Sequence, residues 1–304
     1  MKQLLILSGK GGTGKTTIAS AFIRLAQAKA YADCDVDAPN LHLVNQQANK
    51  ARQTDYFGLP KAQINIDLCI QCDMCRLNCK FAAIIFDQVY RVVPYACEGC
   101  GVCEYLCPVK AVTLIPSISG ELMLYENNDT FSTAQLKMGS GTTGKLVSEV
   151  KKQLKVSVDS RKDLVPLAIL DGSPGIGCPV IASLSGVDIV LIVTEPSISS
   201  ISDMERIINT ARIFQPRIAV CVNKYDTNKE NTEKIVAFCK NNNITFVGTI
   251  PYDVQAVKAI NHHQSIVDVF CPSGYAVMDV FEKTIELLYR NQKSVNRNKG
   301  EKDE

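Results

Sequence analysis

Residues 4–17 read LLILSGKGGTGKTT, an apolar run followed by a glycine-rich loop and then by a lysine and two threonines. The run Leu4–Leu7 is typical of a buried strand, and Thr16–Ala28 has the apolar spacing of a helix. Glycines let backbone N–H groups face phosphate oxygens, and the start of a helix adds positive potential. The stretch therefore predicts a phosphate-binding loop between a strand and a helix.

Individual side chains of this loop suit a nucleoside triphosphate. Lys15 is expected to contact the β- and γ-phosphates, the Thr16 hydroxyl to bind Mg²⁺, and Thr17 to bond the α-phosphate. The predicted nucleotide-binding residues run through the whole loop: Gly9, Lys10, Gly11, Gly12, Thr13, Gly14, Lys15, Thr16 and Thr17.

The rest of the chain alternates apolar runs with helical patterns. Such alternation predicts an α/β fold with a mostly parallel sheet covered by helices on both faces, and the glycine-rich loop makes it a P-loop fold. The expected strands are Leu164–Leu170, Asp188–Val193, Arg217–Val222 and Thr245–Ile250. The expected helices are Lys145–Leu154, Pro179–Leu184, Ser202–Phe214, Thr232–Asn241, Val254–Asn261 and Tyr275–Asn291.

Cysteines interrupt this pattern. Eight of the 13 lie between Cys69 and Cys107, in two runs of Cys-x2-Cys-x2-Cys-x3-Cys that are displaced by 28 positions. Zinc sites usually pair two Cys-x2-Cys knuckles across a longer spacer, so this spacing favours iron–sulfur clusters over zinc. Between the runs, Ala83–Phe86 and Tyr90–Val93 suggest a small hairpin around Asp87-Gln88.

The spacing resembles that of bacterial two-cluster ferredoxins, in which the fourth cysteine of each run ligates the other cluster. The resemblance implies two 4Fe–4S clusters with crossed ligands. One would be held by Cys69, Cys72, Cys75 and Cys107, and the second by Cys97, Cys100, Cys103 and Cys79. Pro108 follows Cys107 as in ferredoxins, whereas Lys80 follows Cys79.

Three regions follow from these patterns. Residues 1–63 and 117–291 are expected to form a discontinuous ATPase domain, and residues 64–116 an inserted ferredoxin-like α+β domain. The polar residues 292–304 are expected to form a disordered tail.

Lys10 adds a second lysine to the phosphate-binding loop. The loop resembles the deviant Walker A motif of the MinD, ParA and nitrogenase iron protein family, where this lysine reaches the nucleotide of a partner subunit. With its cysteine insert, the chain is similar to MinD-superfamily ATPases that contain an inserted ferredoxin domain. The resemblance implies ATP hydrolysis, with catalytic roles for Lys10 and Lys15, and a homodimer formed through the nucleotide site.

Two aspartates continue the resemblance. The segment Asp33–Leu41 looks like the family's first switch, in which the position of Asp35 orients the attacking water. Asp171-Gly172-Ser173-Pro174-Gly175 resembles its Walker B and second switch, which implies that Asp171 lies near Mg²⁺. Cys178 has the same offset from Asp171 as a bridging-cluster cysteine of the nitrogenase iron protein. A second matching ligand is not evident, so a small buried residue in the switch is the simpler interpretation of Cys178.

Two further motifs leave alternatives open. Asn223-Lys224-Tyr225-Asp226 spells the guanine-reading motif of GTPases, but in MinD-type relatives the Asn223 position contacts adenine. ATP is therefore favoured and GTP remains the exception. Residues 139–145 also fit Gly-x4-Gly-Lys. Leu146 follows instead of a Mg²⁺-binding hydroxyl and no strand is expected before the loop, so a surface loop capping the next helix is predicted.

Three functions fit these features. The first is an electron carrier gated by ATP, which passes electrons to a redox partner. The second is an assembly factor that loads clusters or metal into a client protein, and the third is a positioning ATPase whose clusters sense redox state. Eight cysteines within one module favour fixed clusters over cargo.

Composition limits the expected partners and cellular location of the protein. The net charge is +2 at pH 7, so no nucleic-acid partner is indicated. No apolar run approaches the roughly 20 residues of a membrane span. No export signal is recognised at the start of the sequence, and the last residues lack the apolar face of a membrane-binding helix. We therefore expect a cytoplasmic protein.

Overall fold

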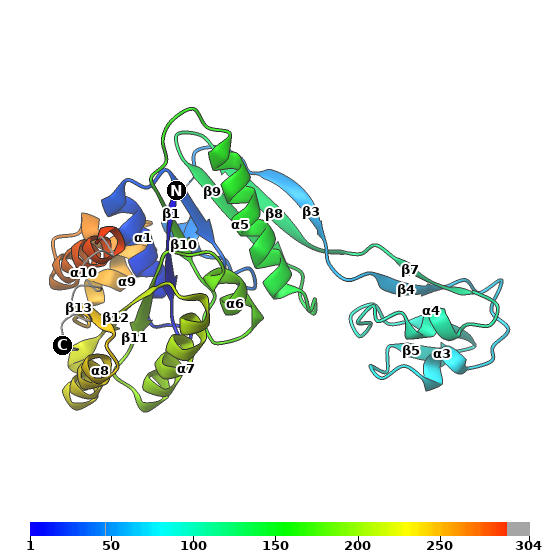
Figure 1. Ribbon diagram of the computed structural model, residues 1–304. Helices are drawn as coiled ribbons and strands as arrows, with labels where there is room; N and C mark the ends of the chain where they lie inside the picture. Colours follow the sequence, from blue (N-terminus) through cyan, green and yellow to red (C-terminus); the bar gives the residue numbers. More distant parts are fainter. Residues whose placement is uncertain (46, 291–304) are drawn as a thin grey trace, which may run out of the picture.

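A nine-stranded sheet forms the centre of the protein (Figure 1). The computed structural model describes residues 1–45 and 47–290, so the predicted tail lies outside the described residues. The strands run in the order β13, β12, β11, β1, β10, β2, β9, β8, β3. Their bounds are β1 Lys2–Leu7, β2 Ala30–Asp33, β3 Arg52–Phe57, β8 Ile118–Glu126, β9 Thr130–Leu136, β10 Leu167–Asp171, β11 Ile189–Thr194, β12 Arg217–Asn223 and β13 Thr245–Ile250.

The seven strands from β13 to β9 are parallel to one another. Strand β8 pairs antiparallel with β9, and β3 pairs antiparallel with β8. All residues of β10 and β11 are buried, which matches their near-continuous apolar sequences. The prediction of an α/β fold with a mostly parallel sheet is confirmed.

Helices cover both faces of the sheet. One face packs against α5 (Thr143–Asp159), α6 (Cys178–Leu184), α7 (Ile198–Phe214) and α8 (Lys229–Asn241). The other face packs against α1 (Lys15–Ala26), α9 (Val254–Asn261) and α10 (Pro272–Tyr289). Short helical turns complete the chain: α2 Leu41–Val44, η1 Tyr225–Thr227 and η2 Ile266–Asp268. None of the helices within the described residues is long and apolar enough to cross a bilayer.

Strands β3, β8 and β9 are absent from the sequence-based prediction. Five of the six residues of β3 are exposed, so its sequence lacks the apolar run by which the other strands were recognised. Strand β9 buries Ser132 and Thr133, which do not read as apolar either. Because β9 precedes residues 139–145, the expectation that no strand precedes this loop is wrong.

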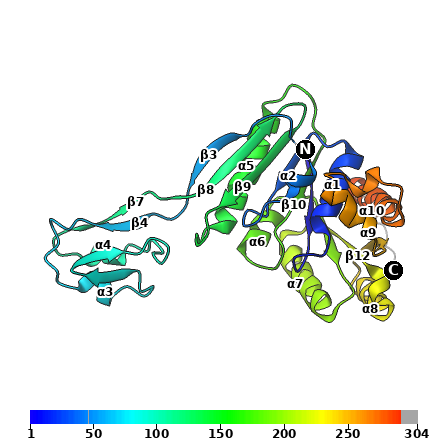
Figure 2. The same cartoon turned by 180° about the vertical axis from the view of Figure 1, so that it is seen from behind.

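The cysteine-rich segment lies away from the main sheet, at the far end of a ribbon that continues from β3 and β8 (Figures 1 and 2). The segment contains two small antiparallel sheets and two short helices. These are β4 Lys61–Ile64 paired with β7 Val112–Ile115, β5 Ile84–Asp87 paired with β6 Val89–Val92, and the helices α3 Met74–Leu77 and α4 Val102–Leu106. Strands β5 and β6 confirm the predicted hairpin.

Candidate functional site

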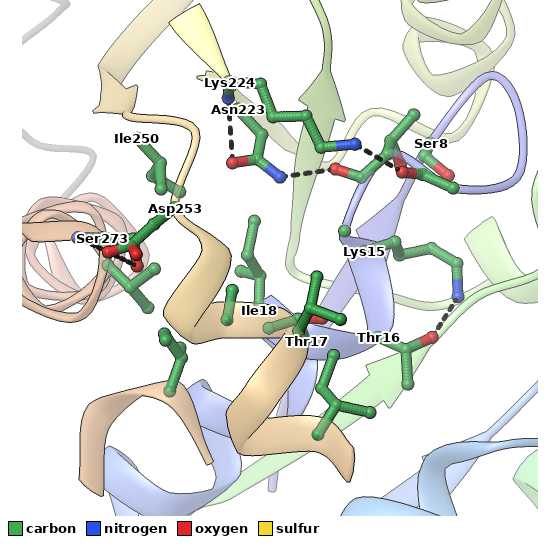
Figure 3. A pocket seen from close by; sticks show the side chains of 18 of the residues that line it. Ser8, Lys15, Thr16, Thr17, Ile18, Asn223, Lys224, Ile250, Asp253 and Ser273 are labelled. Carbon is green, nitrogen blue, oxygen red and sulfur yellow. Dashed lines mark hydrogen bonds between the residues drawn. The ribbon is translucent and has the colours of Figure 1, made fainter. Parts of the chain in front are cut away.

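The glycine-rich loop joins the carboxyl end of β1 to α1, in the centre of the sheet. Gly12 and Gly14 have φ angles of 81° and 86°, a region that favours glycine. The loop borders a cavity of about 620 Å³, which extends to α9 and to the residues after β13 (Figure 3). This volume falls within the range of small-molecule and cofactor sites.

Lys15 lies at the buried end of this cavity and forms an ion pair with Asp171 at the end of β10. The Thr16 hydroxyl donates to the other oxygen of the same carboxylate over 2.7 Å. The structure therefore brings together the two residues that the sequence predicts as Mg²⁺ ligands. Thr13 is also buried here, and its hydroxyl has no hydrogen-bond partner among the described residues. An unpaired buried hydroxyl beside the cavity suits a polar ligand such as a phosphate.

Charges around Lys15 are closely coupled. Burial favours the neutral amine, but Asp171, Asp33 and Asp35 outweigh this effect and raise the pKa of Lys15. Burial and the charge of Asp171 raise the pKa of Asp33 to about 7. Burial also raises the pKa of Asp35, and Lys15 opposes that shift. One buried ammonium thus stabilises a group of three carboxylates.

Asp33 organises the segment that carries Asp35. Its carboxylate accepts from the backbone N–H groups of Asp35, Asn40 and Leu41, each over 2.9 Å. Asp35 lines the cavity as a result. The sequence-based prediction gave Asp33 no role of its own, although an acidic residue at the end of a buried strand was a usable signal.

The segments after β2 and β10 are tied to each other. The Ser173 hydroxyl donates to the Cys34 carbonyl over 2.6 Å, and the Cys34 N–H donates to the Asp171 carbonyl over 2.7 Å. A displacement of either predicted switch segment would therefore strain the hydrogen bonds that hold it to the other segment.

Lys10 lies outside the lining of the cavity. Its amine is 3.4 Å from a carboxylate oxygen of Glu195 and 3.3 Å from the Ser197 hydroxyl. Glu195 also pairs with Lys224 over 2.6 Å. Glu195 was not predicted as a site residue, because nothing local in the sequence shows that it meets two lysines. The predicted role of Lys10 in a partner subunit stays a prediction.

Asn223 and Lys224 close the loop from the side of β12. The Asn223 amide donates to the Thr13 carbonyl over 2.7 Å, and Lys224 donates to the Gly12 carbonyl over 3.0 Å. Both residues line the cavity, whereas the carboxylate of Asp226 lies outside the lining and accepts from the Tyr252 N–H over 2.8 Å.

The cysteine-rich segment is a structural as well as a sequence repeat. Strands β4 and β7 coincide with β6 and β5 after a shift of 28 residues, and α3 coincides with the start of α4. The shift also relates two backbone N–H to sulfur bonds, from Ala83 to Cys79 over 3.3 Å and from Ala111 to Cys107 over 3.1 Å. The segment is therefore built from two equivalent halves.

Each half contributes to two cavities. One is lined by Cys69, Cys72, Cys75 and Cys107, and the other by Cys79, Cys97, Cys100 and Cys103. These are the crossed sets that the ferredoxin resemblance implies. The ligation of iron by these thiols stays a prediction.

Within the described residues, no group of three or more His, Cys, Asp or Glu is close enough to hold a single metal ion. Four thiolates on a cubane each bind a different iron, so they lie farther apart than the ligands of one ion. Burial raises the pKa of Cys75 and of Cys103, its equivalent after the 28-residue shift, and neighbouring cysteines add to the effect. A bound cluster would therefore have to stabilise the ionised form of these thiols.

Residues 4–266 match the CobQ/CobB/MinD/ParA nucleotide-binding domain. The chain belongs to this family. An uncharacterized protein of Methanocaldococcus jannaschii is 31% identical over 291 residues, which are 94% of this chain and 97% of that protein. An iron-sulfur cluster carrier protein of Pyrococcus abyssi is 24% identical, over 94% of this chain and 86% of its own.

The fold agrees with the membership. The cell division ATPase MinD of Pyrococcus furiosus superposes with a TM-score of 0.55 at 16% identity, over 94% of this chain and 99% of that protein. The CobQ/CobB/MinD/ParA family thus accounts for the sheet and the glycine-rich loop. A second similarity is short: pyruvate synthase subunit PorD of Methanothermobacter marburgensis is 39% identical over 67 residues, 22% of this chain and 80% of that subunit.

Proposed function

We propose that this protein is an ATP-hydrolysing iron–sulfur protein in which nucleotide controls electron transfer to a partner protein. The observation that carries the proposal is the pairing of two cavities, each lined by four cysteines, with a phosphate-binding loop in one chain. Family membership supports nucleotide binding.

ATP is the nucleotide that the cavity favours. A guanine base would need a carboxylate to accept from its ring N–H groups, and the candidate for this role is Asp226. Its carboxylate accepts from a backbone N–H outside the cavity lining instead. The Asn223 amide and the apolar residues Ile250, Pro251 and Val257 remain beside the cavity, which suits an adenine base.

The buried charges suit hydrolysis. In this proposal Lys15 exchanges Asp171 for the β- and γ-phosphates, and Thr16 and Asp171 bind Mg²⁺. Asp35, held at the cavity by Asp33, positions the attacking water. Lys10 completes the site of a second copy in a nucleotide-bound homodimer. Its position outside its own cavity is consistent with this role.

The cysteines supply the redox part. Two 4Fe–4S clusters would each accept and donate one electron. Cys69, Cys72, Cys75 and Cys107 would hold the first, and Cys79, Cys97, Cys100 and Cys103 the second. The N–H groups of Ala83 and Ala111 would donate to ligand sulfurs, which favours the reduced, more negative state.

The proposal is tested on protein purified under anaerobic conditions. About eight iron and eight sulfide per chain are expected. The reduced protein is then mixed with an oxidising acceptor, with and without Mg·ATP, and the oxidation rate is followed by absorbance. We expect ATP to change this rate in the wild type and not in Lys15→Ala. Equal rates with and without ATP in the wild type would exclude nucleotide control.

Loading of clusters into a client is the second candidate. A relative at 24% identity is named an iron-sulfur cluster carrier protein. Against this role, Cys239 and Cys271 near the end of the chain are buried and far apart in sequence, so they do not form an exposed pair for cargo. Transfer of labelled iron and sulfide to an apo-ferredoxin would favour loading, and retention of both would favour electron transfer.

A further inference from the structure

The loop between β9 and α5, taken together with the first two residues of α5 as residues 137–144, lies where the predicted switch segments meet the cysteine-rich segment. We propose that this loop positions the second cysteine cavity, lined by Cys79, Cys97, Cys100 and Cys103, in response to nucleotide, and that the first cavity is not coupled in this way. The inference rests on the proposed function and names the residues through which nucleotide would control the second cavity.

The loop is connected to the first switch segment through β9. The Leu136 N–H donates to the Val36 carbonyl over 2.8 Å, and the Gln135 amide donates to the Asp37 carbonyl over 3.2 Å. Both acceptors directly follow Asp35 in the chain. A shift of Asp35 toward a γ-phosphate would therefore pull on the strand that leads into the loop.

The loop is connected to the second switch segment through α5. Gly144, in the first turn of this helix, packs against Cys178, the first residue of α6. Cys178 is exposed, so the expectation of a buried residue there is wrong. A Cβ on Gly144 would lie 3.1 Å from both the Cβ and the carbonyl oxygen of Cys178. The contact is thus tight, because a methyl group on Gly144 would require Cys178 to shift by a few tenths of an ångström. Cys178 follows Asp171 by only seven residues.

The other side of the loop holds the root of the ribbon. The Lys137 N–H donates to the Ser119 carbonyl over 2.8 Å. A Cβ on Gly58 would lie 2.5 Å from the Ser119 hydroxyl and 2.9 Å from that of Thr142. The loop therefore packs directly against the point at which the chain leaves the main sheet.

The root in turn holds the second cavity. Lys61 donates to the Cys97 carbonyl, and the Ala62 N–H donates to the Cys97 sulfur over 3.4 Å. A Cβ on Gly99 would lie 2.3 Å from the Pro60 carbonyl, and one on Gly141 would lie 3.5 Å from a Glu98 carboxylate oxygen. Among the described residues, the loop glycines that come close to the cysteine-rich segment do so at Tyr95 and Glu98, both in the second half.

Amide hydrogen exchange on the full cluster-loaded chain tests the proposal, with and without Mg²⁺ and a non-hydrolysable ATP analogue. In the wild type we expect exchange in residues 95–101 to slow by about fivefold, the low end of typical coupling. Exchange in the equivalent residues 67–73 should not change. An equal change in both halves, or none in residues 95–101, would overturn the proposal.

Gly144→Ala and Gly141→Ala form a matched pair, because each adds one methyl group to the same loop. The Gly144 methyl group would require Cys178 at the start of α6 to shift by a few tenths of an ångström, whereas the Gly141 methyl group would have ordinary contacts. We expect Gly144→Ala to reduce the nucleotide effect on residues 95–101 to less than about twofold, and Gly141→Ala to keep it. A full effect in Gly144→Ala would contradict the role of the loop.

The outcomes separate this proposal from the proposed function. If ATP changes the oxidation rate of the clusters but leaves residues 95–101 unchanged, nucleotide control stands and the loop is not its route. If ATP changes neither quantity, although the analogue protects residues 9–17 from exchange, the proposed function itself is wrong.

Discussion

Lys15 is the residue on which the nucleotide site depends most. It is the buried cation beside Asp33, Asp35 and Asp171, and its amine pairs directly with Asp171. A buried carboxylate without a partner is strongly unfavourable, so the pair matters to the folded chain as well as to the phosphates.

Lys15→Ala should reduce ATP hydrolysis by at least about a hundredfold, because the phosphates lose their buried counter-charge. The same change should lower the free energy of unfolding by about 3–5 kcal/mol, since Asp171 loses its partner. Phosphate release and urea denaturation measure the two effects. Lys145→Ala is the control, because Lys145 is an exposed lysine after a similar glycine-rich loop. Comparable losses in both variants would contradict the assignment.

Asp33 predicts a dependence of stability on pH. Its pKa of about 7 in the folded chain lies above the ordinary value of 3.8. Between these values the folded state retains a proton that the unfolded state has lost. The contribution of Asp33 to stability is thus fully present below about pH 4 and is lost as the pH rises through 7.

The Asp33→Asn variant has no ionisable group at this position, so it should lack this contribution to the change of stability with pH. The measurement is the thermal midpoint by calorimetry between pH 5.5 and 8. The wild type should lose more stability than the variant over this interval, although the variant is less stable throughout because its amide meets backbone N–H groups. Identical slopes in the two proteins would show that Asp33 does not titrate there.

At the scale of elements, the two halves of the cysteine-rich segment show why ligands cross between them. Cys79 and Cys107 follow the short helices α3 and α4, and each lines the cavity formed by the other three cysteines of the opposite run. The helices therefore direct the fourth thiol of each run across the segment.

Cys107→Ser should disrupt the first cluster alone. We expect Cys69, Cys72 and Cys75 to react with an alkylating reagent while Cys97 stays protected, as read by mass spectrometry of the anaerobic protein. Cys79→Ser should give the opposite pattern. Alkylation of Cys97 in the Cys107→Ser variant would mean that each run holds its own cluster.

The sequence predicts an element well when the residues that identify it are contiguous in the chain. The phosphate-binding loop and the cysteine spacing are short and contiguous, so they were recognised, as were most of the parallel strands. Strands β3 and β9 were missed because exposed or polar residues replace the apolar run there. Strand β8 was missed as well, although residues 122–125 are apolar. The contacts of Glu195 with Lys10 and of Asp33 with residues 35–41 depend on tertiary structure, which no local pattern encodes.

At the scale of the whole molecule, the predicted homodimer concerns Lys10. Its side chain is about a third exposed, and it is held by Glu195 outside the cavity of its own chain. A lysine in this position can reach a facing subunit without disturbing the buried Lys15.

Wild-type protein should dimerise with Mg²⁺ and a non-hydrolysable ATP analogue, and Lys10→Ala should associate at least about tenfold more weakly, a loss of about 1.4 kcal/mol. Sedimentation velocity measures both. Lys2→Ala, which removes an exposed ion pair with Asp188, is the control. A wild type that stays monomeric with the analogue, or a Lys10→Ala variant that dimerises normally, would count against a nucleotide-bridged dimer.

The 28-residue repeat has one more consequence. By themselves, the two halves of the cysteine-rich segment are interchangeable, so the pair of clusters proposed for them would have no preferred direction of electron transfer. The chain enters at Lys61 and leaves at Ile115, both in the β4–β7 sheet, and the Cys97–Gly101 loop contacts Pro60 and Lys61 at the root of the ribbon. The attachment thus distinguishes the cysteine cavity nearer the main sheet from the cavity farther away. Two equivalent halves acquire a direction from the place where they are connected to the rest of the chain.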